Sequence, residues 1–411
     1  MTDADVVIIG GGAAGFFAAI ACAEAAPHLR VVILEKSSHF LAKVRISGGG
    51  RCNVTHACFD PAELVGFYPR GASALRGPFS LFQPRDTVAW FEQRGVRLKT
   101  EEDGRIFPVT DSSQTIIDCL LGAAKNAAVQ LATHHGLDDV SRSADGFVLK
   151  LGGGETLRCR QLLLATGGCR GPHAGQPAVS LGHTLEPPVP SLFTFHIAAP
   201  WLRELAGVSI DPAEVSVPGL GLRECGPVLI THAGLSGPAI LRLSAWGARK
   251  LHARDYRFPL HVNWLPQITQ QSLASRLDSL RAAHPAKLLV NTPAPPLSAR
   301  LWEKLVLAAG IPRDRRWADL PRAAKHKLIQ QLLQTPLDVA GKTLNQEEFV
   351  TCGGVRLSEV NFKTMESRLC PNLFFAGELL DIDALTGGFN FQAAWTTGWI
   401  AGRAMARPLS G

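Results

Sequence analysis

Residues 5–26 read DVVIIGGGAAGFFAAIACAEAA, and this stretch decides the fold of the N-terminal part of the chain. DVVII at 5–9 is a short, apolar, β-branched run of the kind found in a buried parallel strand. GGGAAG at 10–15 and an alanine-rich helix follow, and VVILEK at 31–36 supplies a second strand. Because the order is strand, glycine turn, helix and strand, the G-x-G-x-x-G match predicts a dinucleotide site.

Each glycine of this motif has a separate physical role. Gly10 permits the tight turn, Gly12 lets the backbone approach a pyrophosphate, and Gly15 lets helix and strand pack closely. The phosphates would lie over the helix N-terminus, where Ala13 and Ala14 complete this candidate cofactor-binding set. The alternative is a glycine turn that serves packing alone and holds no ligand.

An acidic residue follows the second strand at an informative distance. Glu35 comes 20 residues after Gly15, the spacing at which a carboxylate accepts hydrogen bonds from an adenosine ribose. An acid here favours a ribose hydroxyl over a 2′-phosphate, so we predict tightly held FAD or NAD rather than NADP. Lys36, the next residue, joins the candidate cofactor-binding set.

The C-terminal end favours FAD over NAD. LFFAGE at 373–378 predicts one more apolar strand, closed by Gly377 and Glu378. Flavin-binding folds of the glutathione-reductase type return to the first domain in this way, with a late acid for the ribityl chain. The helix that follows would aim its positive dipole end at the flavin N1 and C2 carbonyl region. Its candidate cofactor-binding residues are Gly387, Gly388, Asn390 and Gln392.

A third glycine turn completes the pattern. QLLLATGG at 161–168 is an apolar strand closed by the candidate residues Ala165, Thr166, Gly167 and Gly168. Three separated glycine turns that converge on one sheet edge are much more specific than any one alone. We therefore predict an α/β fold, with an FAD-binding Rossmann-like domain of the glutathione-reductase type at residues 1–190 plus 345–411.

The middle of the chain changes in character after PPVPSL at 187–192, since prolines do not sit in central strands or helix interiors. Residues 191–265 alternate as short strands of an inserted β subdomain would. Residues 266–344 predict a helical subdomain, with helical spacing at 267–284, 297–310 and 317–334.

Composition excludes several classes of protein. With 46% hydrophobic and 19% charged residues, the 411-residue chain is globular rather than disordered. The apolar N-terminal stretch lacks the basic flank of a signal peptide, so we predict a cytoplasmic protein without a membrane anchor. The nine cysteines include no C-x-x-C pair and the thirteen histidines no H-x-H or H-x-x-x-H grouping, so no metal site is predicted.

The charge balance points towards an anionic partner. Lys and Arg outnumber Asp and Glu by 42 to 35, a net charge of +7, and the excess is concentrated between residues 300 and 327. Such a surface attracts nucleotides, RNA or acidic membrane without selecting one of them. The alternative is a solvated helical face with no partner.

ISGGGRCN at 46–53 places three glycines beside an arginine and a cysteine. Together with DGRIFP at 103–108, THAGLSGPAIL at 231–241 and the glycine turns above, it resembles the BaiN/YhiN-type family of flavoproteins. These are known as NAD(P)/FAD-dependent oxidoreductases, and an aminoacetone oxidase is among the relatives. The resemblance runs in the same order from residue 5 to about 404.

The resemblance implies a role for the residues of this segment. In the family it wraps the flavin, so the candidate cofactor-binding residues are Ser47, Gly48, Gly49, Gly50, Arg51, Cys52 and Asn53. Arg51 would face the ring or the pyrophosphate, and Cys52 is either a proton donor or a packed, inert thiol. His232 in THAGL is either catalytic or satisfied by backbone groups. The helical subdomain would lie over the flavin and close off the substrate site.

One departure from the family follows Gly168, where this chain is short and lacks a Gly-Asp-Gly-Tyr-like stretch that many relatives carry. Cofactor contacts from that loop, and substrate choice with them, are therefore not carried over to this chain.

The function that follows is an FAD-dependent oxidoreductase, with tightly bound FAD and NAD(P)H as a transient electron donor. We expect hydride delivery to an electron-poor C=C bond. Two substrate classes compete: a uridine of ribosomal RNA or its precursor, which the basic surface favours, and small enones such as bile-acid-like steroids. The alternatives are an aminoacetone-type amine oxidase and a non-catalytic flavoprotein that associates with RNA.

Overall fold

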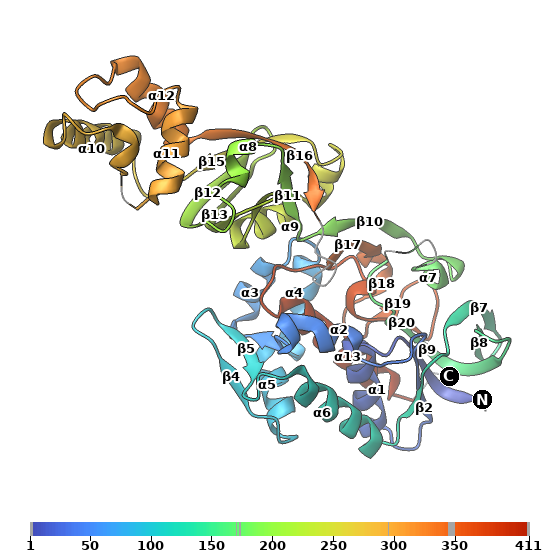
Figure 1. Ribbon diagram of the computed structural model, residues 1–411. Coiled ribbons are helices and arrows are strands. Elements are labelled where there is room, and N and C mark those ends of the chain that lie inside the picture. Colours follow the sequence, from blue (N-terminus) through green and yellow to red (C-terminus); the bar gives the residue numbers. More distant parts are fainter. Residues whose placement is uncertain (1–2, 170, 172–173, 295, 344–349, 409–411) are drawn as a thin grey trace. The chain divides into compact units, whose positions relative to one another are not determined.

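The computed structural model describes residues 3–169, 171, 174–294, 296–343 and 350–408. The chain divides into two compact units, Met1–Ser191 with Val350–Gly411, and Leu192–Phe349. The first unit holds a large sheet with its helices, and the second holds a barrel and the helices α8 to α12 (Figure 1).

The first unit is built on a nine-stranded sheet whose order is β18-β19-β20-β9-β1-β2-β6, with the hairpin of β7 and β8 joined to β9. The strands β20, β9, β1, β2 and β6 run parallel to one another. The strand bounds are β1 Ala4–Ile9, β2 Val31–Leu34, β6 Gln130–Ala132, β7 Leu137–Ser143, β8 Gly146–Leu151, β9 Thr156–Leu164, β18 Val360–Asn361, β19 Glu366–Ser367 and β20 Leu373–Phe375. The predicted α/β Rossmann-like architecture is confirmed.

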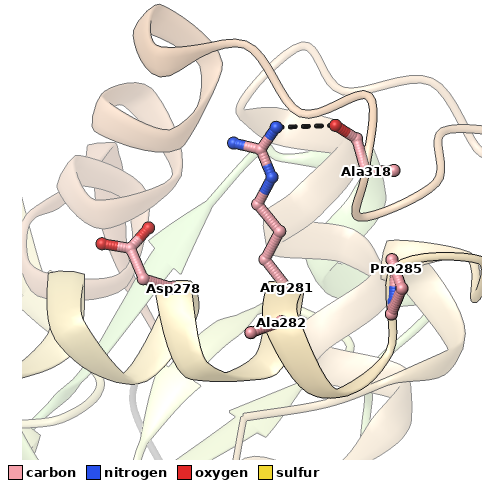
Figure 2. Close-up of a pocket in the computed structure, with 5 residues that line it drawn as sticks. All are labelled: Asp278, Arg281, Ala282, Pro285 and Ala318. Atoms are coloured by element: carbon pink, nitrogen blue, oxygen red, sulfur yellow. Dashed lines mark hydrogen bonds between the residues drawn. The ribbon is translucent and has the colours of Figure 1, made fainter.

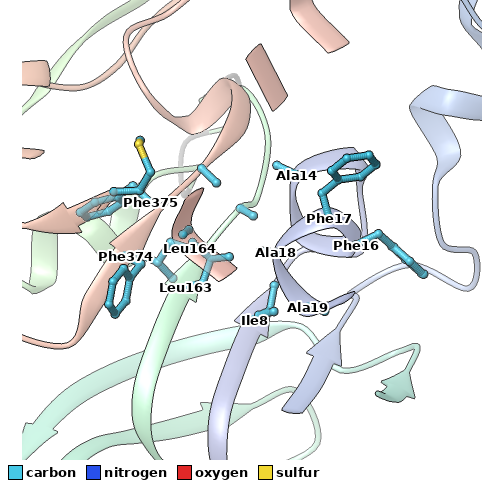
Figure 3. Packing of buried hydrophobic residues seen from close by; sticks show 14 of the residues in the cluster. Ile8, Ala14, Phe16, Phe17, Ala18, Ala19, Leu163, Leu164, Phe374 and Phe375 are labelled. Atoms are coloured by element: carbon cyan, nitrogen blue, oxygen red, sulfur yellow. The ribbon is translucent and has the colours of Figure 1, made fainter. Parts of the chain in front are cut away.

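Two helices from opposite ends of the chain pack against each other in this unit. These are α1 (Ala13–Ala25) and α13 (Phe389–Met405). A Cβ on Gly398 would lie 2.4 Å from the Ala14 carbonyl oxygen, and one on Gly402 would lie 2.2 Å from that of Ala18. The two helices therefore touch backbone to backbone, and glycine is required at both positions. Figure 3 shows apolar side chains of α1, β1, β9 and β20 gathered in the core.

Shorter elements complete the first unit. Its other helices are α2 Ala42–Ile46, α3 Pro61–Leu64, α4 Ala72–Leu81, α5 Pro84–Glu92, α6 Ser113–Asn126 and α7 Gln176–Ser180. A three-stranded sheet comprises β3 Thr55–His56, β5 Arg105–Pro108 and β4 Leu98–Thr100, and a two-stranded one comprises β10 Leu185–Ser191 and β17 Val350–Val355.

The second unit is organised around a closed antiparallel barrel in the order β11-β14-β13-β12-β15-β16. Closure removes the unpaired edges that an open sheet would expose. The bounds are β11 Thr194–Ile197, β12 Ser209–Val217, β13 Leu222–Thr231, β14 Gly234–Ser236, β15 Phe258–Asn263 and β16 Thr335–Thr343. The short helix α8 (Pro200–Arg203) and the longer α9 (Pro238–His252) accompany the barrel.

Three helices follow β15 and precede β16 in the chain, and they lie together in space (Figure 1). The sequence predicted a helical subdomain in this range. The three helices are α10 (Gln270–Ala283), α11 (Ala299–Ala308) and α12 (Arg322–Leu333). One difference concerns the boundary, because β16 closes the barrel yet lies within 266–344, the range assigned to helices. The chain leaves the barrel after β15, forms the helices and returns, so the helical part is 264–334.

No helix in the described residues is long and apolar enough to cross a membrane. The glycine stretch at 152–155 forms the hairpin turn between β8 and β9.

Candidate functional site

The carboxyl ends of β20, β9, β1 and β2 lie at one edge of the sheet because these strands are parallel. The glycine turn after β1 touches the turn after β9, since a Cβ on Gly10 would lie 2.3 Å from the Ala165 carbonyl oxygen. Gly10 also has a φ of +112°, which side chains other than glycine rarely adopt. In open α/β sheets, ligands bind outside the carboxyl ends of the strands.

The N-terminus of α1 opens at this edge. Gly12 is its N-cap residue, no side chain caps the helix, and its first turn carries no acidic residue. A Cβ on Gly12 would meet no heavy atom of the described chain within 4 Å. By contrast, a Cβ on Gly15 would lie 2.1 Å from the Gly10 carbonyl oxygen. Gly12 therefore leaves room for a ligand, whereas Gly15 is needed for packing.

Glu35 is held beside the same turn. Its two carboxylate oxygens accept hydrogen bonds from the backbone N–H groups of Gly11 and Ser37, each at 2.9 Å. Each carboxylate oxygen retains a further acceptor site, which a ribose hydroxyl can use. Lys36 is exposed and packs along Gly136.

Glu378, the acidic residue that follows β20, contacts the turn after β9. Glu378 forms an ion pair with Lys43 of α2, and it accepts a hydrogen bond from the Thr351 N–H at 3.0 Å. A Cβ on Gly168 would lie 2.9 Å from the Glu378 Oε1. Gly167 adjoins Lys43, and Thr166 of the same turn is exposed. Lys43 was not predicted, because it lies in none of the motifs and its partner Glu378 is more than 300 residues away.

Gly377, the residue before Glu378, lies against the start of α1, since a Cβ added to Gly377 would lie 2.9 Å from the Ala14 Cβ. Ala13 lies next to it at the start of the helix. The turns after β1, β9 and β20 are thus brought together. The loop after Gly168 is where this chain departs from the family pattern. Its positions 170, 172 and 173 lie outside the described residues.

The ISGGGRCN segment forms a left-handed glycine loop joined to α13. Gly48, Gly49 and Gly50 have φ values of 56°, 67° and 84°, and side chains on the latter two would meet open space. Asn53, with its amide oriented to satisfy its neighbours, accepts a hydrogen bond from the Gly388 N–H at 2.9 Å. Ser47 donates to the Val44 carbonyl oxygen within the loop.

Arg51 and Cys52 both have their environments supplied by the protein itself. The Arg51 guanidinium pairs with Glu101 at 2.6 Å and lies 4.0 Å from the centre of the Phe107 ring, so the protein itself holds it. Cys52 is fully buried, and burial raises the pKa of its thiol to about 12. The packed, inert alternative for Cys52 fits this environment.

The candidate cofactor-binding residues around the start of α13 fall into two groups. Gly387 and Gly388 form the turn before the helix, and the Asn390 amide closes that turn on the backbone of Ala384 at 3.0 and 3.1 Å. Gln392 is fully buried, with its oxygen accepting from Thr55 and its nitrogen donating to Thr396. Its amide therefore joins α13 to the core, and its contact with a cofactor stays a prediction.

His232 belongs to the second unit, where it is exposed in the turn between β13 and β14. That turn is closed by Thr231, whose hydroxyl oxygen accepts from the N–H groups of Ala233 and Gly234. The imidazole is not needed for this turn, and the structure does not place it among the first-unit residues.

One unpredicted side chain lies beside the start of α13. The His56 ring stacks on Phe389 at 4.6 Å, and Phe67 stacks on the same Phe389 at 4.2 Å. Its Nε2 lies 3.1 Å from the Asp103 carbonyl oxygen, and its Nδ1 is buried without a partner in the described chain. Burial lowers the pKa of His56, which favours the neutral ring.

A buried ion pair fixes the segment between Glu378 and Gly387. Arg70 makes a two-point contact with Asp383, which is fully buried, and Ser191 donates to the same carboxylate at 2.7 Å. Burial raises the pKa of Asp383 even though Arg70 faces it. The pair joins β10, the start of α4 and the approach to α13.

These residues fit an FAD molecule on physical grounds. The start of α1 presents an uncapped, positive helix end with room at Gly12, which suits a pyrophosphate. Two carboxylates, Glu35 and Glu378, lie on either side of it for hydroxyl groups. In the part of the chain that the structure describes, no three His, Cys, Asp or Glu side chains cluster to hold a metal ion.

Comparison with known proteins agrees with this arrangement. Residues 4–404 match the model of the HI0933-like protein Rossmann domain. The chain is 32% identical to the ribosomal RNA dihydrouridine synthase of Escherichia coli (strain K12), over 96% of each protein. It is 31% identical to the 3-dehydro-bile acid delta(4,6)-reductase of Clostridium scindens, over 97% of this chain and 98% of that protein.

A solved structure supports the fold. The 3-ketosteroid delta1-dehydrogenase of Sterolibacterium denitrificans superposes with a TM-score of 0.53 at 14% identity, over 99% of this chain and 100% of that one. The chain therefore belongs to the HI0933-like family, the BaiN/YhiN-type flavoprotein oxidoreductases that its motifs resemble.

Proposed function

We propose that this protein uses NAD(P)H to reduce a C=C bond conjugated to a carbonyl group, and that its substrate is a uridine of ribosomal RNA. Dihydrouridine is uridine with its ring double bond reduced, and a delta(4,6)-reductase also reduces ring double bonds. Both curated relatives are thus named for one type of reaction. The choice between their substrates needs an observation on this chain.

The distribution of charge carries that choice. Residues 266–334, which contain α10, α11 and α12, have eleven Lys and Arg against four Asp and Glu. This excess of seven equals the net charge of the whole chain, so the remaining residues balance. A steroid offers nothing to such a surface, whereas a phosphate backbone is attracted by it. An RNA substrate also implies a cytoplasmic protein.

The residues of the first unit would hold FAD by their own chemistry. The flavin, when bound, supplies two-electron transfer between NAD(P)H and the substrate. Backbone N–H groups at the start of α1 would bind the pyrophosphate, and Glu35 would accept from the adenosine ribose. Glu378 would accept from the ribityl hydroxyls. The positive end of α13 would stabilise negative charge on the flavin pyrimidine ring.

The electron donor is proposed to bind only transiently. The sequence contains no second G-x-G-x-x-G, and GLGL at 219–222 belongs to the connection between β12 and β13. In the net reaction NAD(P)H gives up a hydride, and the C=C bond gains that hydride at one carbon and a proton at the other. The proton is not expected to come from Cys52, whose thiol is closed to solvent.

Product analysis tests this proposal. Ribosomal RNA transcribed in vitro, and so unmodified, is incubated with the FAD-loaded protein and NADPH or NADH, then digested to nucleosides for mass spectrometry. We expect one uridine to gain two hydrogens, in amounts that follow NAD(P)H oxidation. Protein without FAD is the control.

Parallel reactions distinguish the alternatives. Reduction of a 3-keto-4,6-diene steroid with no change in RNA would contradict the RNA assignment and support a small-molecule reductase. Hydrogen peroxide formed from aminoacetone and oxygen, without any reduction, would support an oxidase. Flavin that binds but transfers electrons to none of these acceptors would support a non-catalytic role.

A further inference from the structure

Two shallow cavities lie along α10 on the helical part of the second unit. The first, of about 430 Å³, is lined by Asp278, Arg281, Ala282, Pro285 and Ala318 (Figure 2). The second, of about 460 Å³, is lined by Gln270, Gln271, Ala274, Arg322, Lys325, His326 and Ile329. The lining residues of α10 follow helical spacing from 270 to 282, so both cavities lie on one side of this helix. We call them together the α10–α12 groove.

Two contacts set the walls of the groove. Lys325 of α12 pairs with Asp278 of α10 at 2.7 Å, and this pair joins the two cavities. Arg281 donates to the Ala318 carbonyl oxygen at 2.7 Å, as Figure 2 shows. Asp278 is the one acidic side chain among the lining residues, against two arginines, a lysine and a histidine. The groove therefore carries a cationic excess, which is concentrated in the second cavity, since Arg281 and Asp278 balance in the first.

One of the groove cations has no counter-charge within the described chain. The Arg322 side chain lines the second cavity and makes no hydrogen bond or ion pair with the described residues. The same holds for five cations of the helical part that do not line the groove: Arg276, Lys287, Arg315, Arg316 and Lys327. Arg322 also begins α12, whose first turn has no acidic residue and no side-chain cap. A cation is unfavourable at the positive end of a helix, and crowded like charges destabilise the folded state. An anion bound in the groove would relieve both effects.

We propose that the α10–α12 groove is a docking site for the phosphodiester backbone of RNA, separate from the flavin-binding residues of the first unit. The inference rests on the proposed RNA substrate and assigns the residues that hold it. The 14 residues of α10 span about 21 Å at 1.5 Å per residue, which suits a polymer with repeated charges better than a single phosphate. Phosphate contacts position a nucleic acid, and sequence is read elsewhere.

A paired-variant binding measurement tests the docking site. The probe is a fluorescein-labelled stem-loop from unmodified ribosomal RNA, and its anisotropy is followed at several salt concentrations with FAD-loaded protein. The variant Arg322→Gln/Lys325→Gln removes two groove cations. Each lost phosphate contact lowers the slope of log affinity against log salt by about 0.7–0.9, so affinity at about 0.1 M salt should fall about 25- to 60-fold.

A matched control removes the same charges elsewhere. Arg142→Gln/Lys150→Gln also changes one unpaired arginine and one lysine in an ion pair, here with Asp139, in the hairpin of β7 and β8. We expect it to bind RNA within about twofold of wild type, since it removes no groove contact. The unfolding temperature of the groove variant should change little, because the reduced like-charge repulsion offsets the loss of the exposed Lys325–Asp278 pair.

The outcomes separate this inference from the proposed function. If the groove variant binds as the wild type does, or if the control loses as much affinity, the docking site is wrong. Wild-type protein that reduces RNA in that case leaves the proposed function intact. If the wild type binds RNA through the groove but does not reduce it, docking stands and the proposed function fails. An acidic peptide added as a competitor tests whether the groove binds an acidic protein instead. If the peptide displaces no RNA, that alternative is contradicted.

Discussion

Gly12→Val is expected to give a folded protein that binds FAD at least about 100-fold more weakly than the wild type. The side chain would enter the open space at the start of α1, where no atom of the described chain lies within 4 Å. It would thus cause no clash in the protein and would occupy the place proposed for the pyrophosphate. Loss of one or two hydrogen bonds to a charged group, each about 1.5–3 kcal/mol, corresponds to this factor.

Flavin content and affinity measure this effect directly. Wild-type and variant proteins are stripped of flavin and titrated with FAD, with flavin fluorescence as the signal and circular dichroism as the check of folding. Gly77→Val is the control, since Gly77 in α4 also has open space around a Cβ position and is far from the motif in sequence. A Gly12→Val protein that binds FAD normally would contradict the placement of the pyrophosphate.

Arg70→Met is expected to lower the free energy of unfolding by about 3–5 kcal/mol, the usual cost of leaving a buried charge without its partner. The Asp383 carboxylate is fully buried and would keep only Ser191 from the contacts described above. Its pKa is already raised by burial, and losing Arg70 would raise it further. A raised carboxyl pKa favours folding at acid pH, so the deficit should shrink as the pH falls.

Denaturant unfolding of three variants checks the pair. Arg70→Met and Asp383→Leu should each be strongly destabilised, whereas the double variant should recover most of the loss, because apolar pairs often replace buried ion pairs at little cost. The stability change of the double variant minus the sum of the changes of the two single variants is the coupling energy of the pair. Single variants that each lose under about 1 kcal/mol would show that the contact does not stabilise the approach to α13.

Much of the first unit could be predicted because its signals are local. The runs at 6–9, 162–164 and 373–375 are apolar throughout, as strands buried on both faces must be, and each is followed by a glycine turn. Since parallel strands place their carboxyl ends at one edge, the meeting of these turns follows from the order of elements. The helices α10, α11 and α12 were likewise visible from their spacing, whereas α9 (Pro238–His252) lies within the range predicted as a β subdomain.

The partners of individual side chains could not be predicted where distant residues supply them. Arg51, Cys52 and Gln392 lie in or next to glycine motifs, and the sequence does not reveal that Glu101, the core or Thr55 takes up their polar groups. His56 and Lys43 were missed for the converse reason, because their partners Phe389 and Glu378 are more than 300 residues away. Strand β16 was missed because barrel closure depends on pairing across the helical segment.

The first unit is proposed to hold FAD. NAD(P)H would reduce this flavin, and the reduced flavin would pass the hydride to a uridine of RNA. Anaerobic titration of the purified wild-type protein with NADH and then NADPH, followed by visible absorption, tests this claim most directly. We expect a bound flavin whose oxidised band bleaches with one of the two donors and returns when unmodified ribosomal RNA is added. A flavin that stays oxidised with both donors, or a protein that takes up no FAD, would contradict the claim.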